Sequence, residues 1–159
     1  MNPRYKAPFV AGEYYHVFHH AVGHENLFRE KDNYRYFLQK LNFHIDGYCE
    51  LRAWCLMPNH FHLLIYVNPE LVHTMQPLAI ETRVVKCFSD FLNCYTQSMN
   101  KRFKRRGSMF SGRFRRVRIT DEAHLANIIH YIHSNPLYHN FTNNLESWPY
   151  SSMNKNIVI

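Results

Sequence analysis

The residues best suited to chemistry fall in two short segments that lie far apart in the chain. The first segment holds His60 and His62, inside a run of apolar residues. Side chains two positions apart on a strand point to the same face, so both imidazoles would project together, away from the apolar face. Two such imidazoles can share one metal ion. The chain has 12 histidines, so the pair alone also fits a chance occurrence.

The second segment carries Tyr131 and Asn135 near the end of a predicted helix. Residues four apart lie on one flank of a helix, and Pro136 is expected to end the helix there. A phenol and an amide oxygen placed together could act as a nucleophile and a third metal ligand. A tyrosine hydroxyl titrates near pH 10 and is a poor nucleophile, but a metal on a scissile phosphate would offset this. The alternative is that Tyr131 is one of 11 tyrosines, half-buried at a helix edge.

A third feature is a block of positive charge. The chain carries a net charge of +7, and nine of its 19 basic residues lie in a window without any acid: Lys101, Arg102, Lys104, Arg105, Arg106, Arg113, Arg115, Arg116 and Arg118. Aromatic residues are interleaved with them. Basic and aromatic side chains together suit a phosphate backbone whose unstacked bases lie on rings. We therefore expect a nucleic-acid partner, and the simpler alternative is a solubilising loop.

The scaffold for these groups follows from hydrophobic periodicity. Alternating runs predict strands, and apolar residues at three- and four-residue spacing predict helices. In chain order the pattern gives a strand at 14–22, a helix at 33–47, strands at 51–57 and 61–67, a helix at 80–99, a strand at 114–119, and a helix from an N-cap at 120–121 to about 134. This order predicts an α+β, ferredoxin-like (split β-α-β) fold. It has a four-stranded antiparallel sheet with two helices on one face. The other face stays open, and an added C-terminal helix carries Tyr131.

Composition limits the class of protein. At 159 residues the chain fits one domain, 1–159, with a single core. No apolar run approaches the roughly 20 residues that cross a bilayer, so we expect no membrane association. The start of the chain does not have the pattern of a secretory signal. The four cysteines form no Cys-x-x-Cys pair, which favours a reducing, cytoplasmic location.

Three segments in order strengthen the functional prediction: MPNHFHLL at 57–64, GSMFSGRF at 107–114 and YIHSNP at 131–136. Together they resemble the single-strand DNA transposases of the HUH (His-hydrophobic-His) class, and among these the REP-associated tyrosine transposases. The similarity runs from about Tyr14 to Ser152 and includes the closing WPYSS at 148–152.

The resemblance implies a metal-dependent endonuclease and strand transferase that acts in DNA transposition and recombination. His60 and His62 match the metal-binding histidines, Asn135 matches the third ligand, and the metal would be Mg²⁺ or Mn²⁺. Tyr131 matches the nucleophile that becomes linked to a 5′-phosphate. The substrate would be hairpin-bearing single-stranded DNA. Relatives work either as homodimers or as monomers, and the sequence leaves both open.

The chain departs from the family pattern directly after the third segment. It has Leu137-Tyr138-His139-Asn140 where relatives commonly have a small apolar residue, a basic residue and Ala-Gly. This difference puts the local DNA contacts in doubt. Two alternatives remain open. One is a non-catalytic nucleic-acid-binding module of the same fold. The other is a zinc hydrolase, which would need a further strong ligand and a general base.

Overall fold

The computed structural model describes residues 5–154. Its elements, in chain order, are β1 (Tyr14–His20), α1 (Lys31–Ile45), β2 (Cys49–Met57), β3 (His60–Val67), η2 (Pro69–His73), α2 (Pro77–Arg102), β4 (Arg115–Arg118), α3 (Glu122–Tyr138) and η3 (Leu145–Ser147). Every helix and strand predicted from periodicity is present. The boundaries differ by a few residues, most of all at α2, which extends three residues further at each end.

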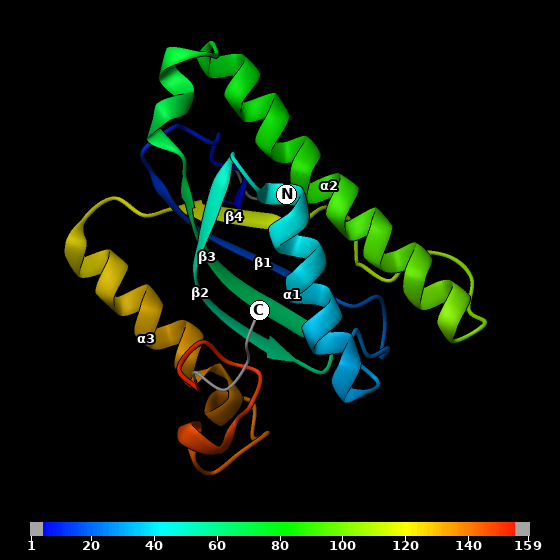
Figure 1. Ribbon diagram of the computed structural model, residues 1–159. Coiled ribbons are helices and arrows are strands. Elements are labelled where there is room, and N and C mark those ends of the chain that lie inside the picture. Colours follow the sequence, from blue (N-terminus) through cyan, green and yellow to red (C-terminus); the bar gives the residue numbers. More distant parts are fainter. Residues whose placement is uncertain (1–4, 155–159) are drawn as a thin grey trace.

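The four strands form one antiparallel sheet in the order β2-β3-β1-β4. This order confirms the predicted ferredoxin-like arrangement, in which β1 and β3 are central and neighbours in sequence are not always neighbours in the sheet. Helices α1 and α2 pack against each other on one face, and α3 lies on the other (Figure 1). None of the helices in residues 5–154 combines the length and apolar character needed to span a bilayer.

The main core lies between the sheet and helices α1 and α2. Strand β3 contributes Phe61, Leu63, Ile65 and Val67 to it, which are the odd-numbered positions of the strand, and all are at most 1% exposed. Helix α1 contributes a stripe with the three- and four-residue spacing of an amphipathic helix: Tyr34, Phe37, Leu38, Leu41 and Ile45. The alternation predicted for β3 is therefore confirmed.

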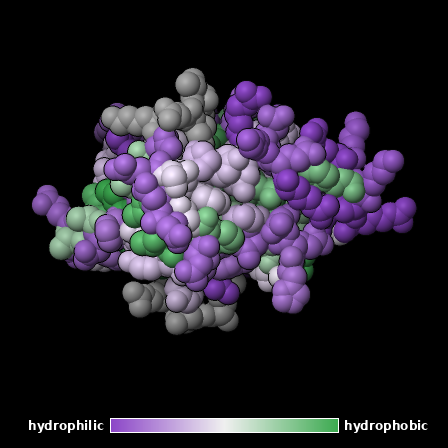
Figure 2. All heavy atoms as spheres, turned by 90° about the horizontal axis from the view of Figure 1, so that it is seen from below, coloured by the Kyte–Doolittle hydropathy of each residue, from purple (hydrophilic) through white to green (hydrophobic). Residues whose placement is uncertain are grey.

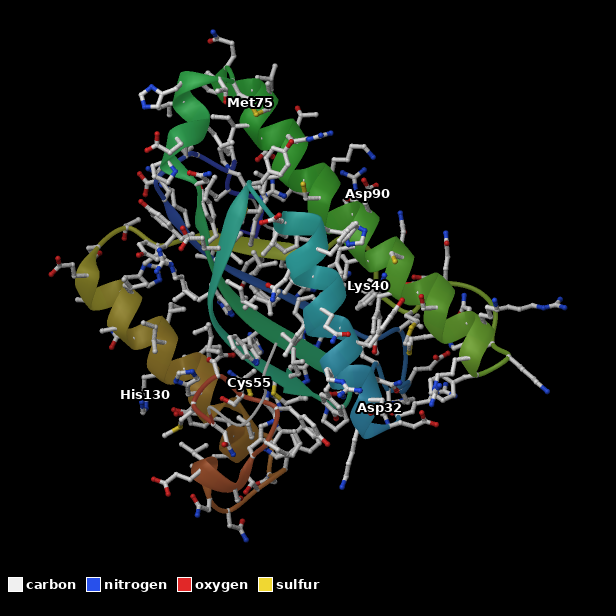
Figure 3. The ribbon with its side chains drawn as sticks, viewed as in Figure 1. Asp32, Lys40, Cys55, Met75, Asp90 and His130 are labelled. Atoms are coloured by element: carbon white, nitrogen blue, oxygen red, sulfur yellow. The ribbon has the colours of Figure 1, made fainter. Side chains whose placement is uncertain are left out.

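A second, smaller core lies on the opposite face, under α3. Its buried members are Ala53, Cys55, Met57, Leu64, Ile119 and Ile132. Cys55 lies on the side of β2 that faces α3, whereas His130 points away from the sheet on the outer side of that helix (Figure 3). The prediction that this face stays open is therefore wrong in part. Helix α3 covers it because Ile132 and its helical neighbours need an apolar surface to pack against.

Helix α3 begins as predicted and ends later than predicted. The side chain of Asp121 caps its first turn by accepting a hydrogen bond from the His124 backbone N–H at 2.8 Å. The prediction that Pro136 ends the helix is wrong, because α3 continues to Tyr138 with the proline inside it. A proline lacks the N–H that its own turn would use, but it does not remove the donors that follow. The His139 N–H accordingly reaches the Asn135 carbonyl at 3.0 Å.

The segment at residues 150–152 links β2 to α3 through hydrogen bonds. The Leu56 N–H donates to the Tyr150 carbonyl at 2.9 Å, and the Ser152 N–H donates to the Trp54 carbonyl at 2.9 Å, so residues 150–152 cover part of the outer edge of β2. The Ser152 hydroxyl also bonds His133 on α3 at 2.7 Å. The segment WPYSS therefore helps to fix α3 over the sheet.

Candidate active site

Strand β3 places the His60 and His62 side chains on the face that α3 covers. Their ring centroids are 5.4 Å apart, and the residues are 3% and 4% exposed. The Nδ1 atom of His60 bonds the side-chain oxygen of Asn59 at 2.7 Å. An amide oxygen only accepts, so Nδ1 donates, and Nε2 is left with a free lone pair. That Nε2 atom is buried and has no hydrogen-bond partner among the described residues.

His62 is oriented by a residue that sequence analysis did not select, His16. The Nε2 atom of His16 and the Nδ1 atom of His62 are 2.8 Å apart, and both residues are buried. If His62 donates this hydrogen bond, its own Nε2 keeps a free lone pair, as at His60. A metal-binding histidine generally donates its second ring nitrogen to an acceptor in this way. The contact depends on the pairing of β1 with β3, which sets His16 opposite Leu64, and a single-sequence pattern cannot give that register.

Helix α3 brings Tyr131 and Asn135 to the same place. The Tyr131 ring packs edge-on against the His62 ring at 5.4 Å and is 40% exposed. Asn135 is fully buried, and its amide nitrogen donates to the Tyr131 carbonyl at 2.8 Å. Its side-chain oxygen is buried without a partner in the described structure. The four residues predicted to act together therefore gather at one site within one chain.

A cavity of about 220 Å³ lies beside the nucleophile candidate. Tyr131 and His62 line it together with Tyr5, His16, Phe18, Val117, His124 and Ile128. Aromatic and imidazole rings dominate this lining. The space is open to a group that must reach both the phenol and the imidazole at once.

Burial keeps the histidines of the site neutral at physiological pH. It lowers the pKa of His60 to about 3 and the pKa of His16 to about 4. The pKa of His62 also lies well below its usual value, first because of burial and then because of the neighbouring imidazoles. A neutral imidazole is the form that binds a metal ion, whereas a protonated one has no lone pair to offer.

The atoms available to a divalent cation come from His60, His62 and Asn135. Within residues 5–154, no three or more His, Cys, Asp or Glu side chains are grouped so as to hold a metal ion. The zinc-hydrolase alternative therefore finds no further strong ligand in the described structure. Two imidazole nitrogens and the orphaned amide oxygen of Asn135 remain available. An amide oxygen is a ligand that Mg²⁺ and Mn²⁺ prefer, whereas an imidazole nitrogen is more typical of Zn²⁺ and other transition metals.

The basic block divides into paired and unpaired residues. Although its own window contains no acid, carboxylates from elsewhere in the chain pair with four of its members: Arg102 with Glu30, Arg105 with Glu25, Arg116 with Glu81, and Arg118 with Glu13. The other five form no ion pair with a described residue. Hydrophilic side chains are dense at the right-hand end of the molecule in Figure 2, where α2 and the following loop lie.

Arg115 is the basic residue that shares a face of the sheet with the site. It pairs with Phe18, and two positions further along β4, Val117 pairs with His16, so alternation puts Arg115 on the His16 side. Its guanidinium lies 5.8 Å from the centre of the Tyr5 ring, which lines the cavity. The remaining block residues are not shown to reach the site.

Two exposed residues at the end of α3 also escaped sequence analysis as candidates. The His139 ring contacts the His60 ring edge-on, with centroids 4.6 Å apart. The Tyr138 ring stacks beside the Tyr131 ring at 6.2 Å. The spacing in the sequence could have indicated both residues, since Tyr131, Asn135, Tyr138 and His139 share one flank of a helix. The expected stop at Pro136 removed the last two from consideration.

Comparisons with known proteins support the resemblance to one family. No family model matches the chain. A curated protein of Haemophilus influenzae, named a REP-associated tyrosine transposase, is 31% identical over 111 residues, which are 68% of this chain and 61% of that protein. The resemblance to the REP-associated tyrosine transposases is confirmed. The chain thus matches about three fifths of the length of this transposase relative.

The fold comparison agrees. A solved structure of a REP-associated tyrosine transposase bound to a REP hairpin matches with a TM-score of 0.72, over 94% of this chain and 81% of that one. The sequence identity is 15%, so this transposase structure establishes the shared fold. The four-stranded sheet and the three helices are common to both.

Proposed function

We propose that the protein cleaves and rejoins hairpin-bearing single-stranded DNA through a covalent bond between Tyr131 and a 5′-phosphate. The observation that carries the proposal is the contact of the Tyr131 ring with the His62 ring, beside His60 and Asn135. Nε2 of His60 and Oδ1 of Asn135 are buried and have no partner among the described residues. A buried polar atom without a partner costs about 1–3 kcal/mol, so two at one place favour a ligand that completes them.

The chemistry of the step is an exchange of one phosphoester for another. The Tyr131 oxygen attacks the phosphorus, the bond from phosphorus to the 3′-oxygen breaks, and the phenolic proton passes to solvent while the 3′-oxygen leaves as a hydroxyl. Because one ester replaces another, the reverse attack by a 3′-hydroxyl rejoins a strand without ATP. Tyr131 is 40% exposed, which leaves its phenol accessible to a strand.

His60, His62 and Asn135 are the residues that would hold the divalent metal. When bound, Mg²⁺ or Mn²⁺ would polarise the phosphoryl oxygens. The chain's own contribution is orientation. Asn59 accepts a hydrogen bond from His60, and His16 would accept one from His62 in the tautomer that leaves the His62 Nε2 lone pair free. The Asn135 amide nitrogen donates to the Tyr131 carbonyl, which directs the Asn135 oxygen away from the helix.

The decisive experiment is a search for a covalent adduct. Incubating the protein with Mg²⁺ or Mn²⁺ and a hairpin-bearing strand should give a protein–DNA species that survives denaturant. Tyr131→Phe should abolish it and leave DNA binding largely intact. Tyr66→Phe is the matched control. It also removes a phenolic hydroxyl, from a residue on the same face of β3 as His60 and His62, and should retain the adduct. A Tyr131→Phe protein that forms the adduct as well as the original refutes the assignment.

Metal binding can be measured without turnover. Titration with Mn²⁺, followed by electron paramagnetic resonance, should show a site that His60→Ala and Asn135→Ala weaken. His16→Phe, which keeps a ring but removes the acceptor, should weaken it about 10- to 100-fold. His16→Gln retains an acceptor oxygen and should lose less. Equal affinities in all four variants would contradict the ligand set. DNA binding without any adduct in the unsubstituted protein would instead favour the non-catalytic module.

A further inference from the structure

The last turn of α3 presents an aromatic ring beside the nucleophile. Tyr131, Asn135 and Tyr138 lie on successive turns of one flank, because their spacing is four and then three residues. The Tyr131 and Tyr138 rings are 6.2 Å apart with an angle of 28° between their planes. Tyr138 is 60% exposed, more than the nucleophile itself. A large flat side chain is therefore open to solvent at the edge of the site.

The backbone that carries this ring is restrained on both sides. The helix carries Pro136 in its last turn, which restricts the backbone there. The Phe141 N–H donates to the Pro136 carbonyl at 2.8 Å and ties the chain back after the helix. The next residue, His139, packs against His60 on the sheet at 4.6 Å. Tyr138 thus projects from a restrained turn, so its backbone needs little ordering before the ring contacts a ligand.

We propose that Tyr138 is a binding site for one nucleobase of the single strand, next to the phosphate that Tyr131 attacks. This inference rests on the proposed function. An unpaired base offers a flat π-face, and stacking on an aromatic side chain accepts any base. Successive phosphates of one duplex strand advance about 3.4 Å along the helix axis, and those of an extended single strand lie further apart. A ring whose centre is 6.2 Å from the centre of the Tyr131 ring therefore lies within about one or two nucleotides of the cut.

The role would be positioning. A base held on Tyr138 fixes the strand on one side of the scissile phosphate, while Arg115 offers a positive charge on the same face of the sheet. A strand anchored beside the nucleophile is held closer to the geometry of attack.

The test uses Tyr131→Phe in every arm, so that no strand is cut. The probes are a DNA hairpin with single-stranded oligothymidylate arms on both sides, and copies in which one thymine at a time is abasic. Affinity is followed by fluorescence anisotropy. At one or two arm positions, the abasic site should weaken binding about 5-fold or more, the lower end of the effect of base–aromatic stacking. Adding Tyr138→Ala should remove that position dependence.

Matched variants separate stacking from other effects. Tyr138→Phe and Tyr138→Trp should restore the pattern, and Tyr138→Leu should not, since leucine has an apolar surface but no π-face. Phe43→Ala is the control, because Phe43 is 75% exposed on α1, which packs on the other face of the sheet.

Two results would overturn the proposal. One is an abasic profile that Tyr138→Ala leaves unchanged, and the other is full rescue by leucine. Failure of the proposed function looks different, since the unsubstituted protein would then form no adduct with the same hairpin. If the unsubstituted protein forms the adduct but Tyr138→Ala does not change the effect of any abasic position, only the stacking site is refuted.

Discussion

The two faces of the sheet use the same strands for different purposes. On the face toward α1 and α2, the side chains are apolar, numerous and almost completely buried. On the face toward α3, a core of six buried residues adjoins a group of histidines and two buried polar atoms, at His60 and Asn135, that have no partner within residues 5–154. The first face supplies most of the stability, and the unpaired polar atoms reduce the contribution of the second.

Strand alternation makes this division testable at the level of adjacent residues. Neighbours on a strand point to opposite faces, so two residues of the same type can differ only in the face they occupy. Three such pairs are Leu63 and Leu64 on β3, Arg115 and Arg116 on β4, and His19 and His20 on β1. Each pair isolates one property, namely packing, charge or protonation.

The leucine pair should show the largest effect. Both residues are at most 1% exposed, Leu63 in the main core and Leu64 under α3. Leu63→Ala should cost about 3–5 kcal/mol of unfolding free energy, and Leu64→Ala about 2–3 kcal/mol, because a thinner layer can relax around the cavity. Urea denaturation measures both.

The activity of the two leucine variants should follow the opposite order. Leu64 packs in the same cluster as Ile132 of α3, so its truncation should loosen the helix that carries Tyr131. Adduct formation per folded molecule should fall in Leu64→Ala and stay near the original rate in Leu63→Ala. Equal losses in the two variants would mean that the faces are not separable.

Much of this division could be predicted from the sequence. The alternation around His60 and His62 and the four-residue spacing of Tyr131 and Asn135 are local patterns, and strand and helix geometry turn them directly into shared faces. The same periodicities gave the order of elements. What local patterns cannot give is which strand lies beside which, and His16 became part of the site only through the pairing of β1 with β3.

The basic block shows that local sequence patterns do not reveal ion pairs between distant segments either. No acid lies within it, yet Glu81 lies opposite Arg116 in the folded chain, 35 positions away in sequence. Pairing between distant segments is set by the packing of whole elements. The wrong prediction that α3 ends at Pro136 has a different origin. A proline disfavours the helical conformation of the residue before it, but it does not rule out that a helix continues through it.

The arginine pair should separate binding from stability. Arg115 is exposed on the site face, whereas the Arg116 side chain is 11% exposed and bonds Glu81 at 2.5 Å and the Ala7 carbonyl at 2.7 Å. Arg116→Gln should lower the unfolding free energy by on the order of 2 kcal/mol, since it leaves a partly buried carboxylate without its partner.

Arg115→Gln should instead leave stability unchanged and weaken binding of single-stranded DNA. Each lost phosphate contact should reduce the slope of log affinity against log salt by about 0.7. Affinities measured by anisotropy at several salt concentrations give this slope. The opposite assignment, with a changed slope in Arg116→Gln alone, would place the DNA on the other face.

The histidine pair should show the smallest effect at neutral pH, because its effect appears only under acid conditions. Burial lowers the pKa of His19 to about 4, while His20 is exposed and its pKa is lowered less. Above about pH 6.5 both the folded and the unfolded chain hold neutral His19, so stability does not change with pH through this residue. Between about pH 6.5 and 4 only the unfolded chain takes up the proton, and stability falls by about 1.4 kcal/mol per pH unit.

Replacing His19 by Gln should therefore flatten the pH dependence of the unfolding free energy by close to one proton across that window. His20→Gln should change it much less. Urea titrations at pH 7.5, 6.0 and 5.0 supply the slopes, and comparing slopes removes any constant loss of stability caused by the substitution itself. Since His19 bonds the Gly112 carbonyl on the core side, away from Tyr131, its variant should retain adduct formation at pH 7.5. A change in the adduct without a change in slope would show that this histidine belongs to the function of the other face.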